Sequence, residues 1–169
     1  MPFPVRKRYR LPYFNYASSH LSFVTICTDK RVPLFGAVRN GVMHLSREGR
    51  MADESWRLIP QLCEYASIDE YVIMPDHLHG IIEIRNPDEP RSIPAPVFAV
   101  RQRSVSTAVR NFKSAVTTKI RKLHDDPGCI VWQSRFYERI IRSEEALDRI
   151  RDYIRNNPSA WEAKQRRRQ

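Results

Sequence analysis

The sequence has few cysteines, few glycines and no long apolar run, and each shortage excludes a class of protein. Its three cysteines (Cys27, Cys63, Cys129) form no Cys-x-x-Cys pair. This argues against a disulfide framework and a cysteine zinc site, so we expect a reducing cytoplasmic setting. The five glycines build neither a phosphate-binding loop nor a Gly-x-Ser-x-Gly elbow. We see no membrane-spanning segment or signal peptide, and we expect no membrane partner.

Acidic residues are scarce relative to basic ones. The chain has 29 Lys and Arg against 19 Asp and Glu, a formal charge of +10 over 169 residues. A domain this basic favours polyanionic partners, because neutralised phosphates release their counterions. We therefore predict one nucleic-acid-binding domain over residues 1–161, followed by a basic flexible tail at 162–169.

Hydrophobic periodicity predicts an α+β protein. Alternating, β-forming stretches predict strands at 21–27, 42–45, 67–74, 77–84 and 131–132 with 136–141. Helical spacing predicts helices at 46–62, at 104–123 and from Ser143 to Pro158. Composition predicts a basic aromatic arm at residues 1–16 and a proline-rich loop at 85–103. The order β-α-β-β-α-β predicts a ferredoxin-like antiparallel sheet with helices packed on one face and an additional C-terminal helix.

Two histidines share one face of the strand predicted at 77–84. His77 and His79 lie roughly 6–7 Å apart along the strand, where both can bind one metal ion. Two strand histidines without any role are the plainer interpretation. Glu83 lies on the same face but about 13 Å away, too far to join the site. Asp76 is a minor candidate ligand.

Tyr153 and Asn157 project side by side from the last helix at i, i+4 spacing. Helical periodicity puts Tyr153 at the edge of the apolar face and Asn157 within it. A buried amide without a partner costs about 1–3 kcal/mol, so Asn157 indicates a site. Packing at the edge of the core for the tyrosine, and a C-terminal cap for the asparagine, remain open.

A single reaction would use all four side chains, the two histidines, Tyr153 and Asn157. The side-chain oxygen of Asn157 can add a third ligand to the two histidines. A metal ion held there polarises a phosphodiester, and the hydroxyl of Tyr153 can attack the phosphorus. The phosphotyrosine product keeps the energy of the cut bond, so the strand can be rejoined without ATP.

Four segments carry a resemblance to a known family. They read Phe-Val-Thr-Ile-Cys-Thr at 23–28, Met-Pro-Asp-His-Leu-His-Gly at 74–80, Val-Trp-Gln at 131–133 and Tyr-Ile-Arg-Asn-Asn-Pro at 153–158. In sequence and in order they resemble REP-associated tyrosine transposases, which are single-tyrosine transposases of the HUH endonuclease superfamily. The resemblance covers residues from about 5 to 161 and implies the same ferredoxin-like fold.

The resemblance also implies a function. His77 and His79 would be the metal pair, Asn157 the third ligand, and Tyr153 the nucleophile. The cofactor would be Mg²⁺ or Mn²⁺, and the substrate single-stranded or hairpin DNA at palindromic repeats. Cleavage would leave a 5′-phosphotyrosine and a free 3′-hydroxyl. The resemblance leaves open a homodimer in which the tyrosine comes from the partner chain.

The chain departs from the family in two places. Asp76 stands where many relatives have Asn, which would affect metal or strand contacts. Residues 19–23 read Ser-His-Leu-Ser-Phe, where many relatives have a segment like Gly-Thr-Trp or Gly-Thr-Tyr. DNA contacts of that segment therefore do not carry over.

Basic side chains supply the candidate DNA contacts: Arg8 and Arg10 in the arm, and Arg110, Lys113 and Arg121 on the helix at 104–123. The helical set could equally be ordinary solvated surface. A non-catalytic module that binds single-stranded nucleic acid, and a metal nuclease that uses water, are the competing functions. Tyr137 is a second candidate nucleophile, though packing is the expected role of a tyrosine on an apolar strand. The run His124-Asp125-Asp126 is expected to be a solvated loop.

Overall fold

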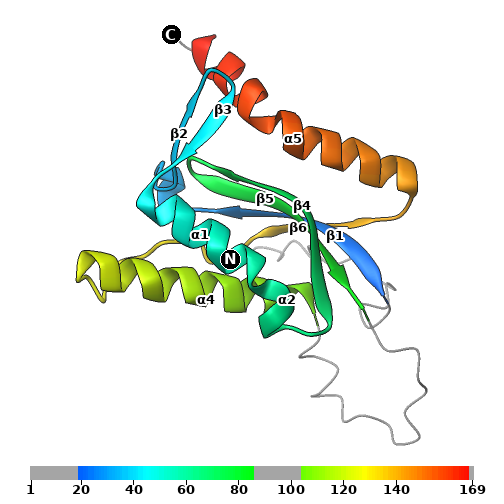
Figure 1. The fold of residues 1–169 in the computed structure, drawn as a ribbon, viewed down its shortest axis with the longest axis horizontal. Coiled ribbons are helices and arrows are strands. Elements are labelled where there is room, and N and C mark those ends of the chain that lie inside the picture. Colours follow the sequence, from blue (N-terminus) through cyan, green and yellow to red (C-terminus); the bar gives the residue numbers. More distant parts are fainter. Residues whose placement is uncertain (1–18, 86–103, 168–169) are drawn as a thin grey trace, which may run out of the picture.

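A four-stranded antiparallel sheet forms the centre of the fold (Figure 1). The computed structural model describes residues 19–85 and 104–167, so the predicted arm and nearly all of the predicted proline-rich loop lie outside the described residues. The strands follow the order β4-β5-β1-β6, with bounds His20–Cys27 for β1, Ala66–Met74 for β4, His77–Ile84 for β5 and Tyr137–Ile141 for β6. Helix α1 (Arg47–Arg57) connects β1 to β4, and α4 (Val105–His124) connects β5 to β6. The predicted ferredoxin-like sheet is confirmed.

Helices cover both faces of the sheet. In Figure 1, α1 and α4 lie on one side, and α5 (Glu144–Arg166) crosses the other. The larger core is on the α1/α4 side, where Trp56, Phe112 and Leu78 are fully buried. A smaller cluster under α5 includes Phe23, Ile81, Leu147 and Ile154. Because side chains alternate along β5, Leu78 and Ile82 enter the large core while the histidines face α5.

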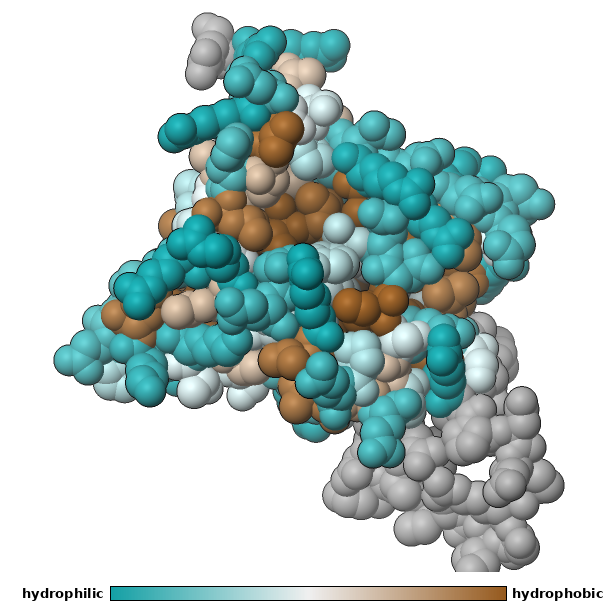
Figure 2. Space-filling model, viewed as in Figure 1, coloured by the Kyte–Doolittle hydropathy of each residue, from teal (hydrophilic) through white to brown (hydrophobic). Residues whose placement is uncertain are grey.

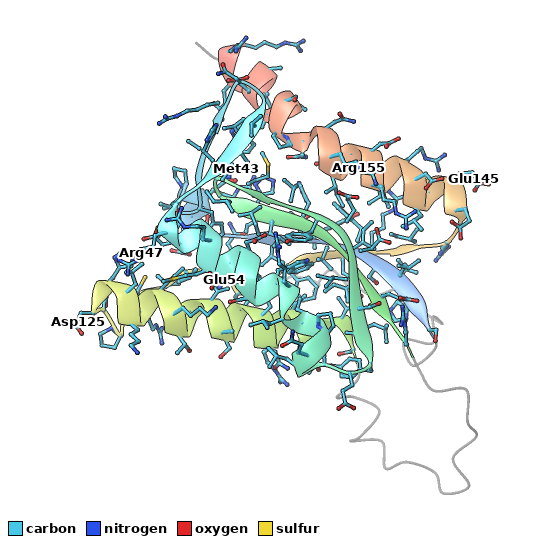
Figure 3. The ribbon with its side chains drawn as sticks, viewed as in Figure 1. Met43, Arg47, Glu54, Asp125, Glu145 and Arg155 are labelled. Carbon is cyan, nitrogen blue, oxygen red and sulfur yellow. The ribbon has the colours of Figure 1, made fainter. Side chains whose placement is uncertain are left out.

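Charged pairs hold the first half of α5 to β4. The ladder between β4 and β5 shifts register between Ile68 and Tyr71, which leaves two acidic residues at an irregular step. Asp69 accepts two hydrogen bonds from Arg151, at 3.0 and 2.6 Å. Glu70 accepts from Arg155, labelled on α5 in Figure 3, at 2.8 Å. Asp148, Arg149 and Asp152 of α5 are exposed. The region of α5 at the upper right of Figure 2 is largely hydrophilic.

The last helix does not end at Pro158. The prediction of an end there is wrong, because α5 runs through the proline to Arg166. Proline removes one backbone N–H, but its fixed φ is still compatible with a helix. Hydrogen bonds from a separate hairpin also attach the second half of α5. Residues 162–166, predicted as part of a flexible tail, are thus helical.

A short hairpin anchors this second half of α5. Strands β2 (Gly36–Arg39) and β3 (Val42–Leu45) pair around Asn40 and Gly41, which both have positive φ, at 53° and 73°. The carboxylate of Glu162 accepts hydrogen bonds from both turn N–H groups at 3.0 Å. The sequence predicts only β3, because Pro33 and Gly36 indicate a turn where β2 begins.

Two other boundaries differ from the predictions. The helix predicted at 46–62 is two helices, α1 and α2 (Ile59–Leu62), because Pro60 cannot continue the first. Trp132 makes only an isolated bridge to Thr28, so residues 131–132 are not part of β6. Ser46 does cap α1, and its side chain accepts from Gly49 N at 2.9 Å. Within the described ranges, no helix combines the length and apolarity that crossing a bilayer requires.

Candidate active site

The two histidines of β5 meet under α5. His77 and His79 are 4% and 7% exposed, and their Nε2 atoms are 3.1 Å apart. The ring centroids are 4.5 Å apart. The structure thus brings both imidazoles to one point on the sheet face, as the alternation predicts.

An oxygen atom fixes each imidazole at its other nitrogen. The Asp76 carboxylate lies 2.5 Å from His77 Nδ1. Thr25, opposite His79 on β1, places its hydroxyl 2.9 Å from His79 Nδ1. A proton on each Nδ1 satisfies both contacts and leaves each Nε2 lone pair directed at the shared point. The Asp76 carboxylate thus contacts His77, and Asp76 does not line the cavity that the Nε2 atoms face.

Helix α5 brings three side chains to the imidazoles at intervals of four residues. The hydroxyl of Tyr153 is 3.2 Å from His79 Nε2, and the tyrosine itself is 50% exposed. Asn157 is 8% exposed and lines the same cavity. The Trp161 ring lies 5.5 Å from the His77 ring. The predicted placement of Tyr153 at the edge of the apolar face and of Asn157 within it is confirmed.

The cavity between α5 and the sheet has a volume of about 290 Å³ and is lined by both histidines, Tyr153 and Asn157. Sequence reasoning missed five further lining residues: Thr25, Arg31, Ala160, Trp161 and Lys164. The last two fall 8 and 11 residues after Tyr153, so a helix continued past Pro158 would have revealed them. Thr25 can be assigned to the site only when the β1–β5 register is known, because it pairs with His79. No sequence pattern indicates Arg31.

Burial keeps the second histidine neutral. The pKa of His79 falls to about 3, first because burial disfavours the charged ring, and then because His77 and Arg31 repel a second positive charge. His79 is therefore neutral at neutral pH, which is the form in which an imidazole can bind a metal ion.

The donor set fits a divalent cation. Two imidazole nitrogens, each about 2.1 Å from one ion, are separated by about 3 Å when the angle at the ion is near 90°, and the observed separation is 3.1 Å. Among the described residues no group of three His, Cys, Asp or Glu side chains could hold a metal. A third ligand from the described residues would belong to another residue type, such as Asn157, which lines the cavity. Glu83 instead bonds Ser67 at 2.6 Å and Arg85 at 2.9 Å, outside the cavity.

The basic side chains predicted to contact DNA on α4 lie across the sheet from this cavity. Arg110, Lys113 and Arg121 line a separate groove of about 380 Å³ beside Trp132. The Lys113 ammonium is already engaged by the Gln133 carbonyl at 2.5 Å, and burial lowers its pKa. Arg121 bonds the Cys129 carbonyl at 3.1 Å. The predicted contacts Arg8 and Arg10 lie outside the described residues.

The other sequence candidates lie elsewhere. Tyr137 is 50% exposed, and its ring meets Phe23 edge-on at 6.4 Å. His124 pairs with Glu48 at 2.8 Å on the surface. Asp125 is the left-handed cap of α4, with φ of 50°. His124 is the last residue of α4 and not part of a loop, while Asp125 and Asp126 follow the helix on the surface as predicted.

Comparisons with known proteins identify relatives. An uncharacterized protein of Haemophilus influenzae is 39% identical over 168 residues, which cover 95% of this chain and 92% of that protein. A putative REP-associated tyrosine transposase of the same organism is 29% identical over 101 residues, covering 58% of this chain and 53% of the relative. No protein-family profile matches the chain.

The fold also has a close counterpart among solved structures. The structure of a REP-associated tyrosine transposase bound to a REP hairpin superposes with a TM-score of 0.61 at 21% identity, covering 91% of this chain and 73% of that one. The resemblance that the motifs predict is thereby confirmed. The chain belongs to one family with the uncharacterized Haemophilus influenzae protein and is a relative of the REP-associated tyrosine transposases, whose fold it shares.

Proposed function

We propose that this protein cuts and rejoins single-stranded DNA next to a hairpin, with Tyr153 as the nucleophile and a divalent ion held by His77, His79 and Asn157. The observation that carries the proposal is the meeting of three groups. The Tyr153 hydroxyl is 3.2 Å from His79 Nε2, which is 3.1 Å from His77 Nε2.

The position of Tyr153 suits attack on a phosphodiester. Its hydroxyl lies beside the imidazoles, and the residue is exposed enough to meet a strand entering the cavity. In the reaction, the bond from Tyr153 Oη to phosphorus forms and the bond from phosphorus to the 3′-oxygen breaks. The phenolic proton is lost and the leaving 3′-oxygen gains one, so a 5′-phosphotyrosine and a 3′-hydroxyl result. The same steps in reverse rejoin the strand.

The remaining groups position the reactants. Asp76 and Thr25 hold the imidazoles in one tautomer and orientation. Asn157 offers an amide oxygen from the helix that carries the nucleophile. When bound, Mg²⁺ or Mn²⁺ would offset charge on the phosphate and favour ionisation of the phenol.

The substrate class follows from charge and from the relatives. The chain carries a formal charge of +10, which favours a polyanion. Arg110 and Arg121 supply a basic groove on the opposite side of the sheet, where a DNA stem outside the cavity can bind. The solved relative is bound to a REP hairpin. We therefore assign hairpin DNA with a single-stranded flank as the substrate. Assembly as a homodimer also remains a proposal, although Tyr153 here reaches the histidines of its own chain.

The test is a covalent adduct. A labelled hairpin oligonucleotide with single-stranded flanks is incubated with protein and Mn²⁺ and then resolved in SDS. We expect an adduct with the parent protein and with Tyr137→Phe, and none with Tyr153→Phe. Tyr137 is a matched control because both tyrosines are 50% exposed on the α5 face of the sheet.

The same gel separates the alternatives. Cleavage without an adduct would favour a nuclease that uses water. Retarded but intact DNA would favour a non-catalytic binding module. An adduct that persists in Tyr153→Phe would assign the nucleophile to another residue.

A further inference from the structure

Arg31 places a positive charge at the wall of the active-site cavity. It lies in the single turn η1 (Asp29–Arg31) that follows β1, and its side chain is 45% exposed. It lines the cavity together with His77 and Tyr153. A cation in this position can contact an anion that enters from solvent.

Contacts on two sides fix the guanidinium. Arg31 Nε lies 3.1 Å from Asp76 Oδ2, and Arg31 Nη1 donates to Cys27 Sγ at 2.8 Å. Cys27 is the β1 partner of His77 in the β1–β5 ladder. The guanidinium is therefore held against the residues that position the first imidazole.

A strained backbone also helps to hold Arg31 at the cavity. Lys30 and Arg31 both adopt left-handed φ values, 49° and 59°, which non-glycine residues disfavour. The hydroxyl of Thr28, only 1% exposed, lies 2.9 Å from the Asp76 carbonyl and 2.8 Å from the Val32 carbonyl. The turn is thus tied to the residue that precedes His77. Strained backbone that the surroundings hold in place is frequent at functional sites.

We propose that the Arg31 guanidinium contacts a non-bridging oxygen of the scissile phosphate and stabilises the charge that develops there while the Tyr153 oxygen replaces the 3′-oxygen. This rests on the proposed function. Arginine suits the role, because its planar fork of N–H groups matches phosphate and it keeps its charge at any working pH. With two N–H groups turned to Asp76 and Cys27, the fork is already oriented before substrate arrives.

The alternative is that Arg31 does not contact the substrate. In that role it would only orient the Asp76 carboxylate, which in turn orients His77. The two roles differ in their effect on metal binding. Loss of a group that orients a ligand lowers metal affinity about 10–100-fold. Loss of a direct phosphate contact leaves metal affinity unchanged or raises it, because a nearby positive charge is removed.

The experiment compares Arg31→Ala, Arg31→Lys and the control Lys30→Ala. Lys30 is an exposed cation in the same turn with the same left-handed backbone, so its substitution reproduces the local change without the cavity contact. Single-turnover adduct formation with Mn²⁺ and the hairpin oligonucleotide gives the rate. Calorimetric titration of the DNA-free protein with Mn²⁺ gives the metal affinity, and thermal unfolding checks the fold of each variant.

We expect Arg31→Ala to form the adduct about 10²–10³-fold more slowly, with Arg31→Lys intermediate and Lys30→Ala within about threefold of the parent. Mn²⁺ affinity should not fall in any of the three. A parallel loss of Mn²⁺ affinity and rate in Arg31→Ala would assign the positioning role instead. An unchanged rate in Arg31→Ala would overturn the inference while leaving Tyr153 as nucleophile. Absence of an adduct with the parent protein would overturn the proposed function itself.

Discussion

The glycine after the second histidine is required by the core beneath it. A Cβ added at Gly80 would lie 2.4 Å from Trp56 Cζ2 and 3.0 Å from Trp56 Cη2. Carbon atoms pack at about 3.5–4.0 Å, so either the strand or the indole must move by about 1 Å. The indole is fully buried and meets Phe112 at 5.2 Å and Tyr71 at 5.9 Å, so it has little room to move.

We therefore predict that Gly80→Ala destabilises the fold. Overpacking costs about 1–3 kcal/mol, partly offset by the reduced entropy of the unfolded chain, about 0.4–1 kcal/mol. A net loss of about 1–2 kcal/mol lowers Tm by about 2–8 °C in a domain of this size. Urea unfolding with an unchanged m value and thermal unfolding by circular dichroism measure both quantities.

Two further variants sharpen the test. Gly128→Ala is the control, because the nearest atom to its added Cβ is a flexible carboxylate oxygen of Asp126 at 3.3 Å, and it should change stability by less than about 0.5 kcal/mol. Trp56→Phe removes the ring atoms that meet the new methyl group, so the loss from Gly80→Ala should shrink in that background. If Gly80→Ala is as stable as the parent, or if its loss is the same in the Trp56→Phe background, the packing argument is wrong.

Three further predictions concern the helix that carries the tyrosine and the support of the metal pair. The hydrogen bond from Arg151 lowers the pKa of Asp69, so its stabilising effect is present above the ordinary Asp pKa and lost as pH falls. Asp69→Asn should therefore cost up to about 1 kcal/mol in urea unfolding at pH 7 and progressively less as the pH falls below the ordinary Asp pKa, and a cost independent of pH would contradict this. Glu162→Ala should raise amide exchange of the β2–β3 turn about tenfold and cost about 1 kcal/mol; unchanged exchange would argue that the hairpin does not depend on α5. Asp76→Ala should weaken Mn²⁺ binding about 10–100-fold by calorimetry, and full affinity would mean that His77 needs no support.

Much of the sheet was predictable because its strands are short runs rich in β-branched and aromatic residues, whose side chains alternate between the two faces with a two-residue period. The same period placed His77 and His79 on one face, and helical spacing placed Tyr153 beside Asn157. Local signals of this kind predict which side chains share an element and a face. The resemblance to the transposases then predicted that the histidines of β5 and the tyrosine of α5 belong to one site.

The site residues that the sequence did not predict are placed by contacts between distant segments of the chain. Pro158 is a local signal for the end of a helix, but α5 continues past it to Arg166. In this second half of α5, Glu162 bonds the β2–β3 turn and Trp161 reaches the cavity. Thr25 reaches His79 only through the β1–β5 register. Arg31 reaches the cavity through a left-handed backbone that no pattern of non-glycine residues predicts.

Mapping the attachment point of DNA tests the central claim most directly. The adduct formed with Mn²⁺ is digested with nuclease and trypsin, and the modified peptide is sequenced by mass spectrometry. We expect a nucleotide on Tyr153 within the peptide 152–155, and no modified peptide when EDTA replaces Mn²⁺. A nucleotide on Tyr137 in the peptide 136–139, or an adduct that forms equally well in EDTA, would contradict it.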